Sequence, residues 1–388
     1  GREHLAEAGC ADAVRDVHAA YLDETLYRLS LRSLGPDELA VHRRIRSLAP
    51  DALVAIDRFV DRHEFGRAID VARCYADAAA GVWRAMCERI ASARDHADAE
   101  TAAIDLFDQL LLEIAAADGF EPLQHWQYSA QREALELLEN GYTPRRHVVA
   151  GSPITVVPWA FDDASFGVVR RYIDRFVDAP AIVRFMLLDD FHIALAFSDW
   201  IDRAIELQPE IERLAGELDS DIARRRCDAN RTLELELAGD YAAAARCAER
   251  AVAGVERPTG RDALAAMRVA RLKALAGEPL SGDDLRRPFE WCRAESLLMQ
   301  VGGSLCSCAI AIDLFGRPEL ADRMVMQVMP VSTRPFYVEL YESRMSARLV
   351  ELLGSDEPPG EPLDDVIADV FALADDIDQR NAEGAASC

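Results

Sequence analysis

The sequence predicts an all-α fold. Apolar residues recur at three- and four-residue spacing almost throughout the 388 residues, as in AIDLFDQLLLEIAAA at 103–117 and REALELLEN at 132–140. Half of the residues are hydrophobic, and many of these are alanines interleaved with charged residues, which is typical of amphipathic helices in a globular chain. Only 147–161 departs from this pattern, so we expect any β-strand to be confined there.

Glycine and proline indicate where the helices end, because neither residue suits a helix interior. The connections between helices are short, and short connections usually join antiparallel neighbours. The expected breaks are Gly35-Pro36, Ala49-Pro50-Asp51, Gly119 to Pro122, Gly141 to Pro144, Pro258 to Gly260, Gly277 to Gly282 and Pro358 to Pro362.

The segment HVVAGSPITVVPWAF at 147–161 has β-branched residues, two prolines and no charged residue, so it is either an extended buried connector or a short edge strand. We place the domain joint there. The expected organisation is an N-terminal helical domain at 1–146, the connector at 147–161, a second helical domain at 162–353, and a C-terminal capping helix with a polar tail at 354–388.

The most specific motif is LAGDYAAAARCAERAV at 237–252. Gly239 can end one helix, Asp240 can cap the next, and Tyr241 can wedge between the two. Small residues give the second helix a face for close packing, namely Ala244, Ala248 and Ala251. This segment resembles the turn and second helix of a tetratricopeptide repeat.

Three further segments are similar to that repeat: 187–209, 63–76 and 315–325. Their anchor alanines, Ala194, Ala68 and Ala321, are irregularly spaced, and a regular 34-residue period is absent. The resemblance therefore implies a degenerate α-solenoid of antiparallel helix pairs in which the domain at 162–353 holds the repeats. It also implies a groove that binds a protein or a peptide.

The charge of the chain limits its partners. The formal net charge is −25 and the pI is about 4.7, which disfavours nucleic acid and anionic membrane surfaces. The basic run at 224–231 is either a local anionic site or an exposed helix face beside acidic neighbours. The nine cysteines are dispersed, so we expect reduced thiols in a cytoplasmic protein, and the apolar stretch at 296–312 is interpreted as a central helix.

No catalytic, metal or cofactor motif stands out, so no catalytic residue, metal ligand or cofactor is expected. The string DDVIAD at 364–369 superficially resembles the aspartate-rich motif of helical prenyl-transfer and terpene enzymes, in which carboxylates hold magnesium against a diphosphate. Cys306 and Cys308 form an isolated C-x-C pair, for which buried packing is favoured over zinc.

The helix that starts at Asp190 supplies the candidate binding residues. Acidic side chains one turn apart lie beside apolar stripes there, and a cationic ligand would find both charge and aromatic surface, although a solvated helix face explains the same acids. Trp200 is interpreted as a core residue rather than a ligand-stacking one. The candidates are Asp190, His192, Asp199, Asp202 and Glu206.

These observations predict a scaffold or regulatory adaptor that binds a basic or amphipathic protein or peptide. Two alternatives stay open. One is a helical enzyme with an acidic metal-assisted pocket, and the other is a peptide-sensing regulator.

Overall fold

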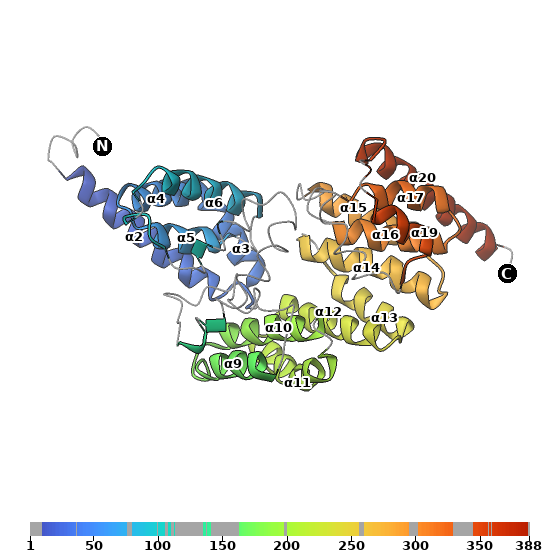
Figure 1. Ribbon diagram of the computed structural model, residues 1–388, viewed down its shortest axis with the longest axis horizontal. Helices are drawn as coiled ribbons and strands as arrows, with labels where there is room; N and C mark the ends of the chain where they lie inside the picture. Colours follow the sequence, from blue (N-terminus) through green and yellow to red (C-terminus); the bar gives the residue numbers. More distant parts are fainter. Residues whose placement is uncertain are drawn as a thin grey trace. The chain divides into compact units, whose positions relative to one another are not determined.

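The protein, described here by a computed structural model, consists of helices and the turns between them, which confirms the all-α class (Figure 1). Sixteen helices and no strand occur among the described residues. The connector expected at 147–161 lies outside them. The structure describes residues 10–35, 37–75, 80–98, 100–104, 108–109, 112, 135–136, 138–140, 163–197, 200–255, 260–294, 302–328, 344–355, 357 and 359–386.

The described residues form two compact units that divide between Arg224 and Arg225, inside a helix. The domain bounds expected from the sequence stay a prediction. The first unit holds eight helices, which pack mostly against their neighbours in the chain. They are α2 (Ala11–Ser30), α3 (Glu38–Ser47), α4 (Ala49–Asp61), α5 (Phe65–Arg73), α6 (Ala80–Asp95), α9 (Asp163–Asp174), α10 (Ala181–Phe197) and α11 (Ile201–Leu218).

Helix α4 illustrates how the sequence sets these elements. Pro50 lies in the first turn, where a backbone N–H would have no partner within the helix, so its absence costs no hydrogen bond. The negative charge of Asp51 beside it interacts favourably with the positive end of the helix dipole. The residues that α4 buries follow helical spacing, so they form one apolar face toward the neighbouring helices. They are Ala52, Ala55, Ile56 and Phe59.

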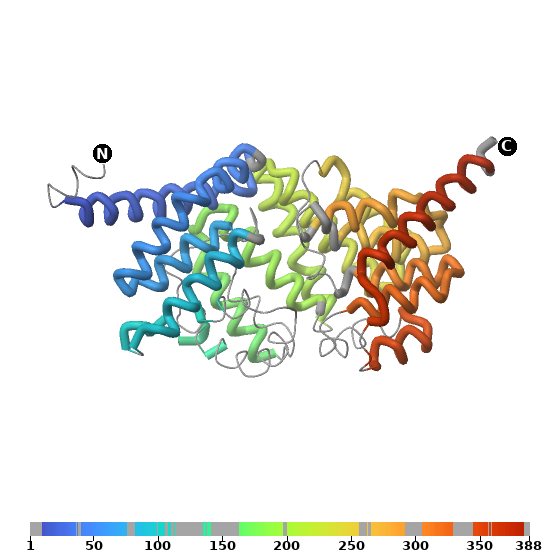
Figure 2. The backbone as a smooth tube through the Cα atoms, turned by 90° about the horizontal axis from the view of Figure 1, so that it is seen from above, coloured from blue at the N-terminus to red at the C-terminus, as the bar shows by residue number. Residues whose placement is uncertain are grey.

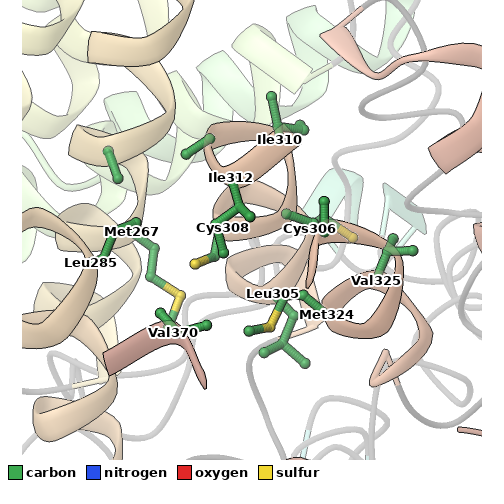
Figure 3. Packing of buried hydrophobic residues seen from close by; sticks show 14 of the residues in the cluster. Met267, Leu285, Leu305, Cys306, Cys308, Ile310, Ile312, Met324, Val325 and Val370 are labelled. Atoms are coloured by element: carbon green, nitrogen blue, oxygen red, sulfur yellow. The ribbon is translucent and has the colours of Figure 1, made fainter. Parts of the chain in front are cut away.

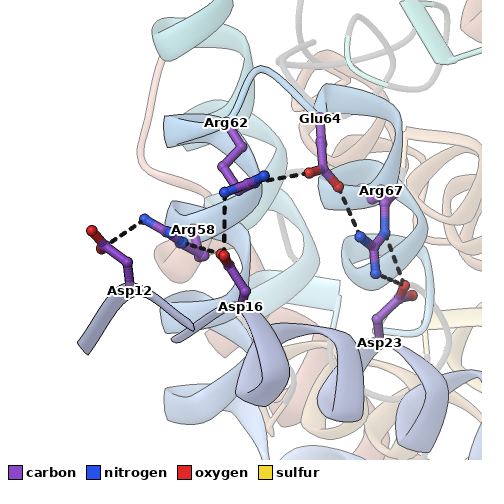
Figure 4. A network of polar contacts seen from close by, with 7 residues as sticks. All are labelled: Asp12, Asp16, Asp23, Arg58, Arg62, Glu64 and Arg67. Atoms are coloured by element: carbon purple, nitrogen blue, oxygen red, sulfur yellow. Dashed lines mark hydrogen bonds and ion pairs between the residues drawn. The ribbon is translucent and has the colours of Figure 1, made fainter. Parts of the chain in front are cut away.

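An ion-pair network joins α2 to α4 and α5 in the first unit (Figure 4). Arg58 donates from Nε to Asp16 at 2.6 Å, whereas Arg67 donates to Asp23 at 3.0 Å and to Glu64 at 2.8 Å. The Asp23 side chain is buried, so its pairing with Arg67 is less screened by water than the outer pairs of the network. Arg62, which bridges Asp16 and Glu64, is half exposed.

Eight more helices follow, and the first of them, α12, spans the division between the two units. All eight belong to the second unit except for the first four residues of α12. They are α12 (Asp221–Leu237), α13 (Tyr241–Val252), α14 (Gly260–Ala276), α15 (Gly282–Ala294), α16 (Gly302–Leu314), α17 (Pro318–Met326), α19 (Ala347–Leu353) and α20 (Leu363–Ala386).

Helix α16 lies in the core of the second unit (Figure 3). Cys306 and Cys308 are both buried although they point to opposite sides of α16, because α14 and α17 both pack against it. Burial raises the pKa of Cys308 to about 12, which suits an inert packing residue. The apolar stretch read from the sequence is thus partly this central helix. No described helix combines the length and the apolar character that a membrane crossing requires.

Helix α20 lies along α15 and α17 of the same unit (Figure 2). Three arginines flank it with ion pairs: Arg286 to Asp375 at 2.6 Å, Arg317 to Asp376 at 3.2 Å, and Arg323 to Asp369 at 2.6 Å. Between these pairs runs a buried apolar seam, formed by Val366, Ile367, Val370, Leu373, Ala374 and Ile377. Helix α20 therefore completes the core of the second unit.

The structure differs from the sequence prediction around Trp200. A single helix from Asp190 to Leu207 was expected, but α10 ends at Phe197 and α11 begins at Ile201. Helix α11 also continues past Pro209, where the repeat was expected to end, up to Leu218. Pro209 is exposed inside α11, and its ring removes one backbone hydrogen bond of the helix.

Candidate functional site

Three aromatic rings meet where α9, α10 and the start of α11 come together. The Phe166 ring of α9 stacks on Trp200, with centroids 5.7 Å apart and an interplanar angle of 23°, and it lies 5.4 Å from the Phe191 ring of α10. Phe191 is fully buried, whereas Phe166 and Trp200 are partly exposed. The stack therefore joins the core of the first unit to its surface.

A guanidinium group of the chain itself lies on this stack. The Cζ atom of Arg203 is 5.6 Å from the centroid of the Phe166 ring, within the range of a cation–π contact. Arg203 also donates to Glu206 at 2.8 Å. That hydrogen bond, the charge of Glu206 and the charge of Asp163 raise the pKa of Arg203.

The acids exceed the bases at this corner. Asp163 and Glu206 are exposed acids whose charges act on Arg203, and the exposed Asp202 precedes Arg203 in the chain. We call these four residues, with Phe166 and Trp200, the aromatic–acidic corner. An exposed aromatic face beside carboxylates binds guanidinium or ammonium groups, because the ring quadrupole and the carboxylate both attract a cation.

The residues predicted from the sequence divide between the interior and the surface. Asp190 is 6% exposed and His192 is fully buried, so neither lies on an exposed polar face. The chain turns at Trp200, and the expected single helix face is therefore broken there. Asp202 and Glu206 are exposed on α11, and Asp199 lies outside the described residues. The binding role of these residues stays a prediction.

Sequence reasoning did not identify Phe166 or Arg203 as site residues. Phe166 lies 34 positions before Trp200 in a helix with an ordinary amphipathic pattern, so nothing local pairs the two rings. The only usable signal was the spacing of Arg203 and Glu206, because residues three apart on a helix are neighbours.

A second polar cluster is buried inside the second unit. Glu236 of α12 accepts from Nη2 of Arg271 on α14 through both carboxylate oxygens, at 2.6 and 2.7 Å. The Nε atom of Arg344 lies 3.1 Å from Oε1 of the same carboxylate. Glu236 is 4% exposed and Arg271 is 1% exposed, so this is an interior ion cluster.

Burial raises the pKa of Glu236, but the charges of Arg271, Arg268 and Arg344 lower it by more. The pKa of Glu236 therefore lies below the ordinary value of 4.5, and the carboxylate is ionised at neutral pH. An interior ion pair of this kind is costly to break, because removing one partner leaves the other buried with its charge.

The turn between α12 and α13 has the geometry that its sequence suggests. Gly239 has φ of +78°, the left-handed conformation that favours glycine at the end of a helix. The Asp240 side chain accepts from the backbone N–H of Ala243 and caps α13. Tyr241 packs at the edge of the α13–α14 core, in which Ala244 is fully buried. Ala251, at the end of the helix, is 3% exposed.

The anchor alanines of the other three repeat-like segments are also in the core. Ala68, Ala194 and Ala321 are each at most 1% exposed. A small buried side chain at these positions lets neighbouring helix backbones approach closely.

Acidic and cysteine motifs do not converge on a metal centre in the described part of the chain, where no three or more His, Cys, Asp or Glu side chains are grouped to hold an ion. Within DDVIAD, Asp364 and Asp365 lie in the first turn of α20 and Asp369 pairs with Arg323. The helical-enzyme alternative stays a prediction, and thermal stabilisation of the chain by Mg²⁺ would support it.

The chain matches no protein-family model, no curated protein sequence and no solved structure at a significant level.

Proposed function

We propose that the chain is a protein- or peptide-binding scaffold or regulatory adaptor that holds a basic or amphipathic partner. It is built on an α-solenoid similar to those of tetratricopeptide repeats (TPR-like). The observation that carries this proposal is the guanidinium of Arg203, which lies over Phe166 and beside Glu206 on an exposed face. An arginine or lysine of a partner can occupy the same position by displacing Arg203. The net charge of −25 attracts such a partner over a longer distance.

Two features of the structure support the proposal that the scaffold is TPR-like. Helices pack on their neighbours in the chain, as α13 does on α14 and α16 does on α17. The Gly239 turn, the Asp240 cap and the buried Ala244 provide the residues that such a helix pair requires. In the regulatory version of this proposal, the bound peptide is the signal.

Two substitutions with opposite expected effects test whether a cationic side chain of a partner binds at the position of the Arg203 guanidinium. The probe is an amphipathic Arg/Leu peptide, compared with the same peptide carrying citrulline in place of arginine. Arg203→Gln should tighten binding of the arginine peptide about 2- to 5-fold, because it removes the internal competitor, and Glu206→Gln should weaken it by a similar factor. Citrulline should abolish the difference, because it has no charge.

Matched controls make the same charge changes elsewhere in the first unit. Arg175→Gln and Asp178→Asn alter exposed residues outside the corner and should each change binding by less than the paired variant. The proposal is wrong if the wild-type chain does not distinguish the arginine peptide from the citrulline peptide, or if Arg203→Gln and Glu206→Gln both weaken binding.

Charge reversal extends the test to a natural partner once one has been purified. Replacing Asp199 and Asp202 by lysine should weaken binding, and raised salt should weaken it too. Indifference to both changes would exclude electrostatic capture on α11.

A further inference from the structure

Helix α14 uses two of its sides for packing and leaves a third to its arginines. Ala266, Val269 and Leu272 pack against α13, and Met267 and Ala270 lie in the core shared with α15 and α16. Residues three apart share a helix face, so Arg268 and Arg271 lie together on the side between these two packing faces.

The two arginines have different surroundings. Arg271 is buried and binds both oxygens of Glu236, and Arg344 approaches the same carboxylate. Arg268 is partly exposed, and within the described part of the chain it makes no hydrogen bond or ion pair. It lies three residues before Arg271 in α14, on the same face of the helix, which places it beside the cluster.

A guanidinium in this position favours an anion. It has five N–H donors in a planar fork, and partial burial removes some of the water that would otherwise satisfy them. The nearby carboxylate of Glu236 is already bound by Arg271 and approached by Arg344, so Arg268 has no carboxylate of its own in the described residues.

We propose that Arg268 is the contact point of an oxyanion site at the Glu236–Arg271–Arg344 cluster, which binds a carboxylate or a phosphate of a small ligand. Both groups present two oxygens that match the guanidinium fork. Arg271 and Arg344 bind the Glu236 carboxylate, and their charges add positive potential beside Arg268. This site lies in the second unit and does not depend on the aromatic–acidic corner.

The test uses the full chain with ¹⁵N-labelled arginine side chains and three probes. These are inorganic phosphate, N-acetyl-leucine, and the uncharged N-acetyl-leucinamide, all at constant ionic strength. The Nε–Hε signal of Arg268, assigned by its loss in Arg268→Gln, should shift saturably with phosphate or N-acetyl-leucine and stay unchanged with the amide. The anion that saturates at the lower concentration identifies the class of ligand.

Two variants and one control accompany the titrations. Arg268→Gln should weaken the saturable stabilisation of the chain by the anion at least about 10-fold, and Arg268→Lys should weaken it less, because the charge remains while the fork is lost. Arg246→Gln, an exposed arginine on α13, should leave it unchanged. The proposal is overturned if neither anion gives a saturable shift, if the amide acts like the acid, or if Arg268→Gln retains the stabilisation.

Discussion

Gly282, the first residue of α15, donates its backbone N–H to Oδ1 of Asp378 on α20 at 2.7 Å, across 96 residues of sequence. The carboxylate of one helix thereby caps the N-terminus of another. A side chain at Gly282 has no room, because an added Cβ would overlap the carbonyl oxygen of Ala374 and the carboxylate of Asp378.

Gly282→Ala should therefore lower the free energy of unfolding by about 1–3 kcal/mol, because the Ala374 carbonyl belongs to the backbone and cannot rotate away. Gly216→Ala in α11 is the matched control. An added Cβ there meets nothing within 4 Å, so this change should stabilise the chain by roughly 0.5–1 kcal/mol. Denaturant unfolding measures both. Equal effects of the two substitutions would contradict the close approach of α15 and α20.

The packing of α13 on α14 is tested with Ala244→Leu. Ala244 is fully buried against Val269 and Leu272, so a larger side chain should overpack the pair and cost about 1–3 kcal/mol. Ala242→Leu, on a partly exposed position of the same helix, should change stability by less than about 0.5 kcal/mol. An unchanged melting temperature of Ala244→Leu would refute the repeat-like packing there.

Glu236→Gln should cost roughly 3–5 kcal/mol at neutral pH, because it leaves the charge of Arg271 buried. The pKa of Glu236 is lower in the folded than in the unfolded chain, so the carboxylate stabilises the fold above about pH 4.5 and this stabilisation is lost as pH falls through the lower folded value. The difference between wild type and variant should narrow from pH 6 to pH 3.

Added salt distinguishes the contribution of the buried Glu236 cluster to the free energy of unfolding from the contribution of surface ion pairs. Arg323 binds Glu361 at the surface and lowers the pKa of that carboxyl too. The cost of Glu361→Gln should be smaller and should fade in 0.5 M NaCl, whereas the cost of Glu236→Gln should persist. A Glu236→Gln effect that vanishes in salt would mean that the cluster is solvated.

The network of α2, α4 and α5 offers a pair of arginines in different environments. Arg67 forms an ion pair with the buried Asp23, and its Cζ atom lies 4.2 Å from the centre of the Phe59 ring. Arg62 forms ion pairs with the partly exposed Asp16 and Glu64 (Figure 4). Arg67→Gln should cost about 1–3 kcal/mol and Arg62→Gln at most about 1 kcal/mol. Thermal unfolding at low and high salt compares them, and the reverse order of costs would be inconsistent with this burial.

The sequence was informative where structure is local. Proline and glycine positions indicated the start of α4 at Ala49, the end of α14 before Gly277 and the start of α20 at Leu363, because backbone restrictions act within a few residues. The break at Trp200 was missed, because the residues around it keep the composition of a continuous amphipathic helix. The backbone of Trp200, with φ of −101° and ψ of 41°, shows that the chain leaves the helical conformation there.

Contacts between distant residues were beyond sequence reasoning. Glu236 and Arg271 are 35 positions apart, and each looks like an ordinary charged residue of a solvated helix face. Their burial follows from the fold of the second unit, which brings these two residues and Arg344 together in its interior. The burial of His192 was missed for the same reason. Its acidic neighbours in the sequence suggested an exposed position, but the residues of α10 around it are buried.

The apolar seam of α20 also affects the order in which the chain can complete its second unit during synthesis. At about 5–20 residues per second, Asp378 follows Gly282 by on the order of 5–20 s, since 96 residues separate them. During that interval the nascent α15, and later α17, expose the surfaces that α20 covers in the finished unit. The growing chain therefore keeps an apolar surface of its second unit exposed until α20 has been synthesised.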